Sequence, residues 1–243
     1  MFNSLNSSVN AFKESPIQFA YATFVAILMN FIVLFALAGI YLIFFFVMSI
    51  LNLTSVIEAF AVLGGVLAIV YLYFFSAFKG ALLNAYSTAS KKSRVSVTEF
   101  YNYALSNGFR FFSLKILQIL LLLLLIGPLV AFYFLYLKAN PIKYADYALL
   151  VLGIAELFFV ELFFYPAYVS ATVFSSGVFK SLKFAFTFFR KKHLYAFLLF
   201  VLYCFVWLFN FIPVIQLVTL FVVQPIIVTA MILFVQNTIT KQK

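Results

Sequence analysis

The chain has 243 residues, of which 67% are hydrophobic and 9% are charged, and it includes 36 Phe and 15 Tyr. A soluble domain carries roughly 25% charged residues, and a soluble fold of this length has too little interior to bury so many aromatic rings. The composition therefore excludes an ordinary soluble fold and indicates helices that are buried in lipid.

The basic residues are distributed in a pattern that predicts membrane topology. Fourteen of the 16 Lys and Arg fall in four clusters, namely Lys13, residues 79–115, residues 180–192, and Lys241 with Lys243, and only Lys138 and Lys143 fall elsewhere. Long apolar stretches separate the clusters, so the positive-inside rule places every cluster on the cytoplasmic side. The net charge is +10, and the basic residues that produce it alternate with these apolar stretches. This arrangement predicts contact with anionic lipid headgroups and argues against nucleic acid as a partner.

Six stretches are apolar and long enough to cross a bilayer, which takes about 20 residues. In chain order, the predicted spans are residues 20–50, 56–78, 111–137, 147–172, 194–210 and 214–236. Polar or proline-containing turns join them in pairs at residues 52–55, 139–141 and 211–213. An even number of spans with every basic cluster on one side places both termini in the cytoplasm. We therefore predict an all-α, multi-pass membrane protein with six transmembrane helices.

Amphipathic segments precede the first, third and fifth predicted spans. They are centred on Phe2, Leu5, Val9 and Phe12, then on Val97, Phe100, Tyr101, Ala104 and Leu105, and finally on Val178, Phe179, Leu182, Phe186 and Phe189. These spacings are helical. Ser96 and Glu99 form a capping-box signature at the start of the second segment. In the third segment, we expect Lys180, Ser181, Lys183 and Arg190 to face away from the apolar stripe.

The three segments predict an internal repeat. Ser-Val-x-x-Phe occurs at residues 8–12 and 96–100, and Phe-Arg occurs at residues 109–110 and 189–190. Each unit is an in-plane helix followed by a two-span hairpin, at about residues 1–78, 96–172 and 176–238 of a single transmembrane domain covering residues 1–243. Units with an even number of spans enter the membrane from the same side and are parallel repeats. The alternative is that any helix at a membrane interface becomes amphipathic.

A family resemblance rests on two stretches, residues 79–116 and 166–198. They combine the Ser-Val-x-x-Phe start, a hairpin, and a Pro-containing span that leads into Gly-Val-x-x-Ser-Leu-x-x-Ala-Phe at residues 177–186. This pattern resembles a prokaryotic group of six-span membrane proteins of largely unassigned function, similar to the membrane domain that accompanies some glycerophosphodiester phosphodiesterases. The resemblance implies a location in the prokaryotic inner (cytoplasmic) membrane. It does not imply phosphodiesterase activity, because the soluble barrel of the fused proteins has no counterpart in this sequence.

Two carboxylates, Glu156 and Glu161, fall well inside a predicted span. Five residues on a helix turn the side chain by about 140°, so the two do not form one paired-carboxylate centre. Glu161 precedes Pro166, which frees the carbonyl of Leu162 as an acceptor for a protonated Glu161. Two interpretations stay open for Glu161, a neutral acid that joins helices and an ion or proton site. The candidate intramembrane polar site comprises Glu156, Glu161, Asn30, Asn210 and Gln224.

Cys204 and His193 are the only cysteine and histidine in the chain, so we expect no metal site, no cofactor and no catalytic residues. The leading hypothesis is a non-enzymatic membrane protein that organises lipid or is a subunit of a membrane complex, with another membrane protein or a second copy of the chain as partner. The alternative is a transporter or channel for a small solute or proton that uses Glu156 and Glu161. The candidate contacts with anionic lipid are Lys91, Lys92, Arg94, Arg110, Lys180, Lys183, Arg190, Lys191 and Lys192.

Overall fold

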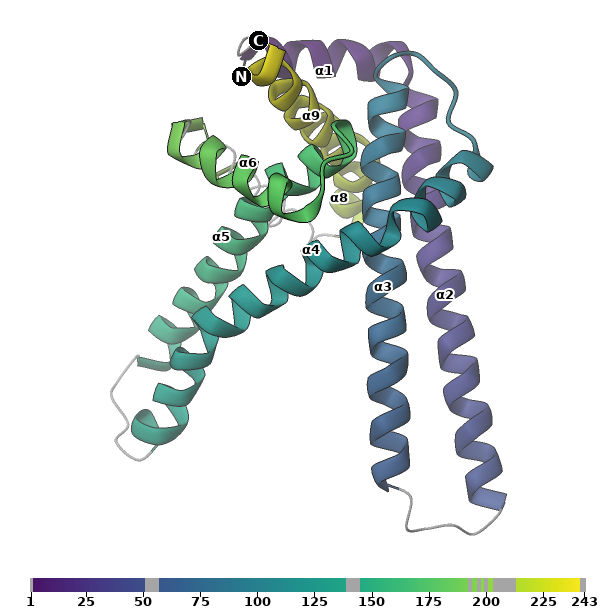
Figure 1. The fold of residues 1–243 in the computed structure, drawn as a ribbon, viewed down its shortest axis with the longest axis vertical. Helices are drawn as coiled ribbons and strands as arrows, with labels where there is room; N and C mark the ends of the chain where they lie inside the picture. Colours follow the sequence, from purple (N-terminus) through teal and green to yellow (C-terminus); the bar gives the residue numbers. More distant parts are fainter. Residues whose placement is uncertain are drawn as a thin grey trace. The chain divides into compact units, whose positions relative to one another are not determined.

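The computed structural model describes residues 2–50, 57–138, 145–191, 194–195, 198, 201–202 and 213–240. Within these residues every element is a helix. The elements are α1 (Phe2–Glu14), α2 (Pro16–Ile50), α3 (Ile57–Ala89), α4 (Val97–Phe132), η1 (Tyr133–Leu137), α5 (Ala145–Val173), α6 (Val178–Lys191), α8 (Pro213–Val218), η2 (Thr219–Val223) and α9 (Gln224–Thr240) (Figure 1). Both η1 and η2 are single π-helical turns.

Among the described residues, five helical stretches are long and apolar enough to cross a membrane. They are Pro16–Ser49, Ala59–Ala89, Val97–Leu137, Tyr147–Val173 and Ile215–Asn237. The predicted all-α class is thereby confirmed, and the helices are those of a membrane-embedded, multi-pass protein. Most of the predicted span at residues 194–210 and most of the predicted turns lie outside the described residues, so the count of six stays a prediction.

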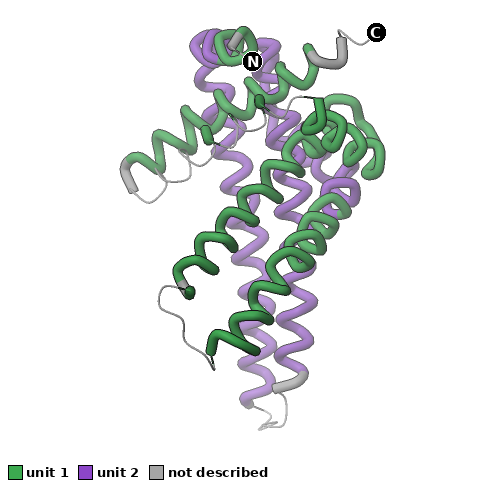
Figure 2. Tube along the Cα trace, turned by 90° about the vertical axis from the view of Figure 1, so that its left-hand side faces the viewer, with its two compact units in different colours: residues 1–8, 113–243 green, residues 9–112 purple. Residues whose placement is uncertain are grey.

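The chain divides into two compact units (Figure 2). Unit 1 comprises Met1–Ser8 and Ser113–Lys243, and unit 2 comprises Val9–Phe112. The helix α4 contributes to both units, its first part to unit 2 and its remainder to unit 1. The predicted single domain over residues 1–243 and its three repeats stay predictions.

Unit 2 is built on the hairpin of α2 and α3, which lie side by side over most of their length (Figure 1). The hairpin is joined near one end by a buried polar contact, in which the Thr23 and Tyr86 hydroxyls lie 2.7 Å apart. The ring of Phe19 packs against that of Tyr86 with centroids 5.7 Å apart. These contacts satisfy both hydroxyls inside an apolar core, where an unpaired polar group is costly.

The loop between α3 and α4 is held against the start of α2. The backbone N–H of Val95 donates to the side-chain carbonyl of Gln18 at 3.0 Å, and the Lys92 ammonium pairs with the Glu14 carboxylate at 2.9 Å. Lys92 takes a left-handed backbone conformation with φ of 61°, which turns the chain after α3 ends. The Ser96 hydroxyl then accepts from the Glu99 N–H at 3.1 Å, so this half of the predicted capping box is confirmed.

One expectation for this region is wrong. The sequence predicts an in-plane helix separate from the third span, whereas α4 runs without interruption from Val97 to Phe132. The reason lies in residues 106–115, which contain no proline and include only one glycine, Gly108. Every residue in this stretch has a backbone N–H that can donate to the preceding turn. The helix can therefore continue through residues 106–115 without a break.

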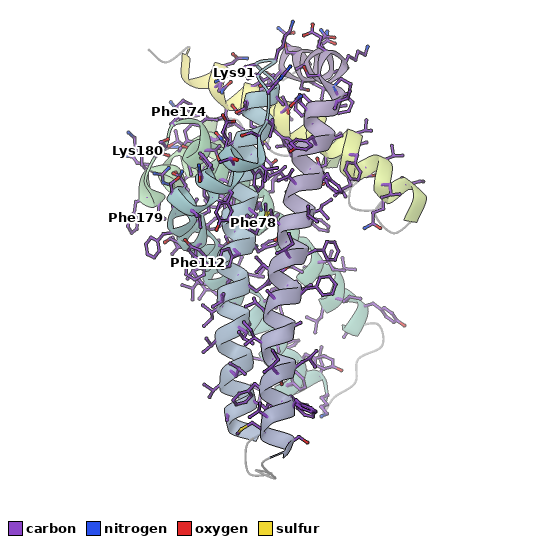
Figure 3. All side chains as sticks on the ribbon, turned by 90° about the vertical axis from the view of Figure 1, so that its right-hand side faces the viewer. Phe78, Lys91, Phe112, Phe174, Phe179 and Lys180 are labelled. Atoms are coloured by element: carbon purple, nitrogen blue, oxygen red, sulfur yellow. The ribbon has the colours of Figure 1, made fainter. Side chains whose placement is uncertain are left out.

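The first part of α4 packs closely on α3 through small residues. A Cβ placed on Gly80 would overlap the ring of Phe111, and one on Gly108 would lie 2.7 Å from the Tyr73 hydroxyl. Aromatic rings flank these contacts, with Phe112 packing on Tyr73 at 5.6 Å and Phe78 on Phe100 at 6.1 Å between centroids (Figure 3). Close approach of helix backbones at small residues is a common way for membrane helices to associate.

In unit 1, α6 lies across the end of α5 at a steep angle (Figure 1). The connection is held by three buried serines. The Ser176 hydroxyl lies 3.1 Å from that of Ser170 and 2.6 Å from that of Ser181. The ring of Phe188 meets that of Phe234 on α9, with centroids 5.7 Å apart. The serines therefore fix the direction in which α6 leaves α5, because each hydroxyl finds its partner only in this arrangement.

We expect Gly80→Ala to lower the free energy of unfolding by about 1–3 kcal/mol, because the added methyl forces the buried Phe111 ring to move. Gly65→Ala on the same helix is the matched control, since nothing lies within 4 Å of a Cβ at that position. The control should be neutral or slightly stabilising, as alanine favours a helix more than glycine does. Unfolding in mixed micelles, followed by circular dichroism, measures both. Equal losses in the two variants would contradict the close packing at Gly80.

Candidate functional site

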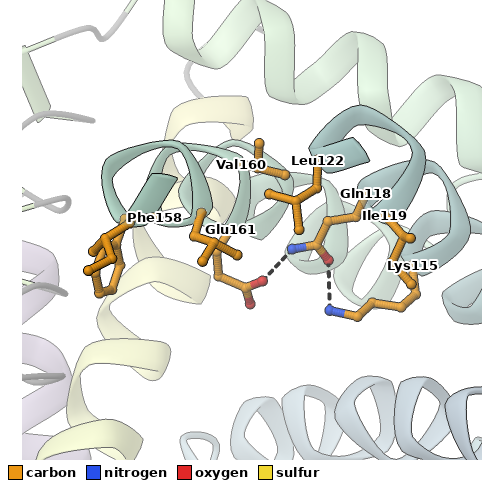
Figure 4. Close-up of a pocket in the computed structure, with 9 residues that line it drawn as sticks. Lys115, Gln118, Ile119, Leu122, Phe158, Val160 and Glu161 are labelled. Carbon is orange, nitrogen blue, oxygen red and sulfur yellow. Dashed lines mark hydrogen bonds between the residues drawn. The ribbon is translucent and has the colours of Figure 1, made fainter. Parts of the chain in front are cut away.

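A polar cluster joins α4 and α5 inside unit 1. Its centre is the buried side chain of Gln118. The Gln118 amide nitrogen donates to the Glu161 carboxylate, while its oxygen accepts from the Lys115 ammonium at 3.2 Å and from the Tyr168 hydroxyl at 3.1 Å (Figure 4). A glutamine amide donates at one end and accepts at the other, so this side chain meets a cation and a carboxylate at the same time.

The positions of these groups follow from helical spacing. Lys115 and Gln118 are three residues apart on α4, and Glu161 and Tyr168 are seven residues apart on α5. Both spacings place the side chains of a pair on the same face of their helix. The two helices therefore present matched polar faces to each other, and Gln118 bridges them.

A partly open pocket of about 260 Å³ adjoins the cluster. Lys115, Gln118 and Glu161 line its polar side (Figure 4). The rest of its wall is apolar and comprises Ile119, Leu122, Ile154, Leu157, Phe158 and Val160. A pocket with one polar group of residues and an otherwise apolar wall is suited to an amphipathic ligand.

Among the predicted polar residues, Glu161 reaches this pocket and Glu156 does not line it. The Oε2 atom of Glu156 is buried and has no hydrogen-bond partner among the described residues. Glu156 and Glu161 are offset by about 140° around α5, and this offset predicts that the two carboxylates do not share a site. Their different positions relative to the pocket agree with that prediction. From the sequence, Gln118 is one of several amides at membrane depth that could line a cavity with Glu156 or Glu161, and the structure brings Gln118 to Glu161.

Asn30 and Gln224, two other residues of the predicted polar site, do not line the pocket. Asn30 belongs to unit 2, where its amide nitrogen donates to the Ala26 carbonyl at 2.8 Å and its Oδ1 is buried without a partner in the described structure. Gln224 starts α9, and its backbone N–H donates to the Thr219 carbonyl in the π-helical turn before Pro225. Asn210 lies outside the described residues.

Sequence reasoning alone misses two members of the cluster. It counts Lys115 only as a basic residue near a span, and it does not single out Tyr168. The one available signal is the spacing of Lys115 and Gln118, which predicts that they share a helix face. No sequence pattern in a single chain predicts that Glu161 faces them, because that depends on how α5 packs on α4.

A second feature is the amphipathic helix α6. It packs on the rest of unit 1 through Ser181, Ala185 and Phe188, of which Ser181 and Ala185 are fully buried. Phe179 and Phe186 point the other way and are 84% and 65% exposed. Ser181 thus lies on the opposite side of α6 from Phe179 and Phe186, in agreement with its predicted position away from the apolar stripe. Lys183 and Arg190, which were also expected to face away from the stripe, lie one turn from those two rings instead. The small Ser181 and Ala185 allow α6 to approach α5 closely, and the serine hydroxyl bonds there to Ser176.

The exposed face of α6 combines aromatic rings with cations. Lys183 follows Phe179 by four residues and Arg190 follows Phe186 by four residues, so each cation lies one turn from a ring. We call Phe179, Lys183, Phe186 and Arg190 the outer face of α6. Phe179 and its neighbour Lys180 both project away from the helix (Figure 3).

The remaining predicted lipid contacts are also on the surface. Lys91, Lys92 and Arg94 are exposed in the loop after α3, while Arg110 on α4 is half-buried. Lys180 and Lys191 are exposed on α6, and Lys192 lies outside the described residues. Within the part of the chain that the structure describes, no group of His, Cys, Asp and Glu is arranged to hold a metal ion.

Comparisons with known proteins do not add to this geometry. No family model matches the chain, and no curated protein and no solved structure gave a match. The resemblance to the six-span prokaryotic membrane proteins therefore stays a prediction, and any function has to be argued from the residues themselves.

Proposed function

We propose that this chain is a non-enzymatic integral membrane protein that orders anionic lipid through the outer face of α6. The observation that carries the proposal is the pairing of exposed aromatic rings with cations on that face, Phe179 with Lys183 and Phe186 with Arg190. A helix that lies in the interface plane uses its rings to enter the acyl region and its cations to meet phosphates. Each cation contributes about 1 kcal/mol near an anionic surface.

The packing of α6 supports this assignment. Its opposite side is already occupied by contacts within unit 1, including the ring pair of Phe189 with Phe163, whose centroids are 5.5 Å apart. The rings of the outer face are therefore not needed to hold the helix in place. Because the helix is formed before it meets lipid, binding does not have to offset the entropy of ordering it.

The proposal includes a topology. We place six spans in the membrane, both termini and α6 on the cytoplasmic side, in the inner membrane of a prokaryote. We also propose three parallel repeats along the chain, in the second of which the amphipathic segment and the span form one helix, α4. The support is the set of five apolar helices and the concentration of basic residues between them. The resemblance to six-span membrane proteins agrees with this arrangement, as does the absence of a recognisable catalytic motif in the sequence.

A transporter or channel is the second candidate. It is favoured by one observation, the carboxylate of Glu161 at the wall of a partly open pocket beside Lys115 and Gln118. An ionisable group at membrane depth is a reasonable site for a proton or an ion. We rank it second because the pocket wall is mostly apolar.

The double variant Lys183→Gln, Arg190→Gln should lose most of the preference of the protein for anionic lipid. With about 1 kcal/mol for each cation, the relative association of phosphatidylglycerol over phosphatidylcholine should fall by up to about thirtyfold. Electron paramagnetic resonance of spin-labelled lipids around the reconstituted protein measures this ratio at low salt. Lys138→Gln, on the predicted outer side, serves as the control. An unchanged ratio in the double variant would refute the proposed role of α6.

Proteoliposomes that contain a pH-sensitive dye should take up protons no faster than protein-free liposomes, and Glu161→Gln should leave that rate unchanged. Glu156→Gln is the matched control, because it makes the same chemical change on the same helix away from the pocket. Protein-dependent uptake that disappears in Glu161→Gln and persists in Glu156→Gln would replace the lipid-ordering proposal with the transporter.

A further inference from the structure

We propose that the pocket between α4 and α5 binds a single phospholipid whose headgroup carries a primary ammonium next to its phosphate. The inference goes beyond the ordering of anionic lipid by α6, and it involves none of the residues of that helix. It depends on the chemistry of the pocket wall and on the order of its residues along the two helices.

The charges of the pocket match those of such a headgroup. The Lys115 ammonium is suited to a phosphate, and the Glu161 carboxylate is suited to an ammonium. Gln118 contacts both groups, because its oxygen accepts from Lys115 at 3.2 Å and its nitrogen donates to Glu161. An ethanolamine headgroup also carries opposite charges separated by a short linker. It is complementary to both ends of this pair in a way that a simple anion is not.

The apolar wall indicates a lipid rather than a soluble metabolite. Along α4 the lining passes from Lys115 to Leu122, a rise of about 10 Å, and on α5 it passes from Glu161 to Ile154. The polar residues therefore lie at one end of the pocket and apolar residues at the other. An acyl chain that leaves the headgroup would run along Leu122 and Ile154, where burial of its methylenes is favourable.

The depth of the polar end agrees with the position of a headgroup. Lys115 falls only four residues after the predicted start of the third span at residue 111, which places it near the predicted cytoplasmic interface. The volume of about 260 Å³ is slightly below that of typical ligand pockets, roughly 300–1,000 Å³. It accommodates the headgroup and the beginning of one chain, and the open side leaves the rest of the lipid in the bilayer.

The test is a titration of the purified full-length protein in detergent, read by native mass spectrometry. The probes are dilauroyl phosphatidylethanolamine, phosphatidylcholine and phosphatidylglycerol with the same chains, and glycerophosphoethanolamine, which has no chains. We expect the ethanolamine lipid to bind about tenfold more tightly than the other two lipids, since only its headgroup offers Glu161 a cation with N–H donors. The choline headgroup has no N–H, and the glycerol headgroup donates only through neutral hydroxyls. We expect glycerophosphoethanolamine to bind at least about tenfold more weakly than the ethanolamine lipid, because it leaves the apolar wall uncovered.

Three variants assign the binding to the pocket. Glu161→Gln should remove the preference for ethanolamine, and Lys115→Gln should weaken all three phospholipids about tenfold. Leu122→Trp fills the apolar end without changing a charge, so it should weaken every lipid even if the charge variants fold poorly. Glu156→Gln and Lys183→Gln are the controls, and neither should change the affinities, because neither residue lines the pocket.

Two results would overturn the inference. Equal affinity for the three headgroups, or a preference that survives Glu161→Gln and Leu122→Trp, would show that the pocket does not select an amino phospholipid. Glycerophosphoethanolamine that binds as tightly as the full lipid would assign the site to a soluble ligand. Neither result bears on the proposed ordering of lipid by α6. The double variant Lys183→Gln, Arg190→Gln tests that role and leaves the pocket unchanged, so either proposal can be refuted while the other stands.

Discussion

The need to pair polar groups inside an apolar medium governs most of this structure, with the Oδ1 of Asn30 and the Oε2 of Glu156 as exceptions. A chain that is 67% hydrophobic cannot leave backbone N–H and carbonyl groups to water at membrane depth, and helices satisfy them internally. Polar side chains follow the same rule by bonding to the preceding turn, as Thr23 does to Phe19 and Thr172 to Tyr168. The polar groups that bond across helices instead are few in the described structure, and they mark the places where the packing is specific.

Gln118 is the clearest example, because it bonds to Lys115 on its own helix and to Glu161 and Tyr168 on α5. Removal of the amide would leave a cation and a carboxylate without the group that contacts both. The serine cluster at the start of α6 has a comparable role, since it fixes the angle at which that helix leaves α5. Through that angle, it determines which side of α6 faces away from the protein.

The sequence predicted the fold class well and the packing poorly. Apolar length and the capping signature at Ser96 were sufficient to place α4 and α5, because those features depend on local chain chemistry. The apolar stripe of α6 was identified from its helical spacing, and the structure leaves Phe179 of that stripe exposed. A soluble protein would bury that stripe, but in a membrane protein lipid is a second apolar solvent. Glu161 was identified from its type and depth, while its partner Gln118 required knowledge of how the two helices pack.

If the outer face of α6 enters the lipid, spin labels on that face lie below the phosphates in the reconstituted protein, and their depth can be measured. Labels at Phe186→Cys and Lys180→Cys, in a Cys204→Ser background, report collisions with oxygen, which dissolves in the bilayer, and with a water-soluble nickel complex. The label at residue 186 should collide mainly with oxygen and lie below the phosphates, whereas the label at residue 180 should collide mainly with the nickel complex. Equal and high exposure of both labels to the nickel complex would contradict this position of α6.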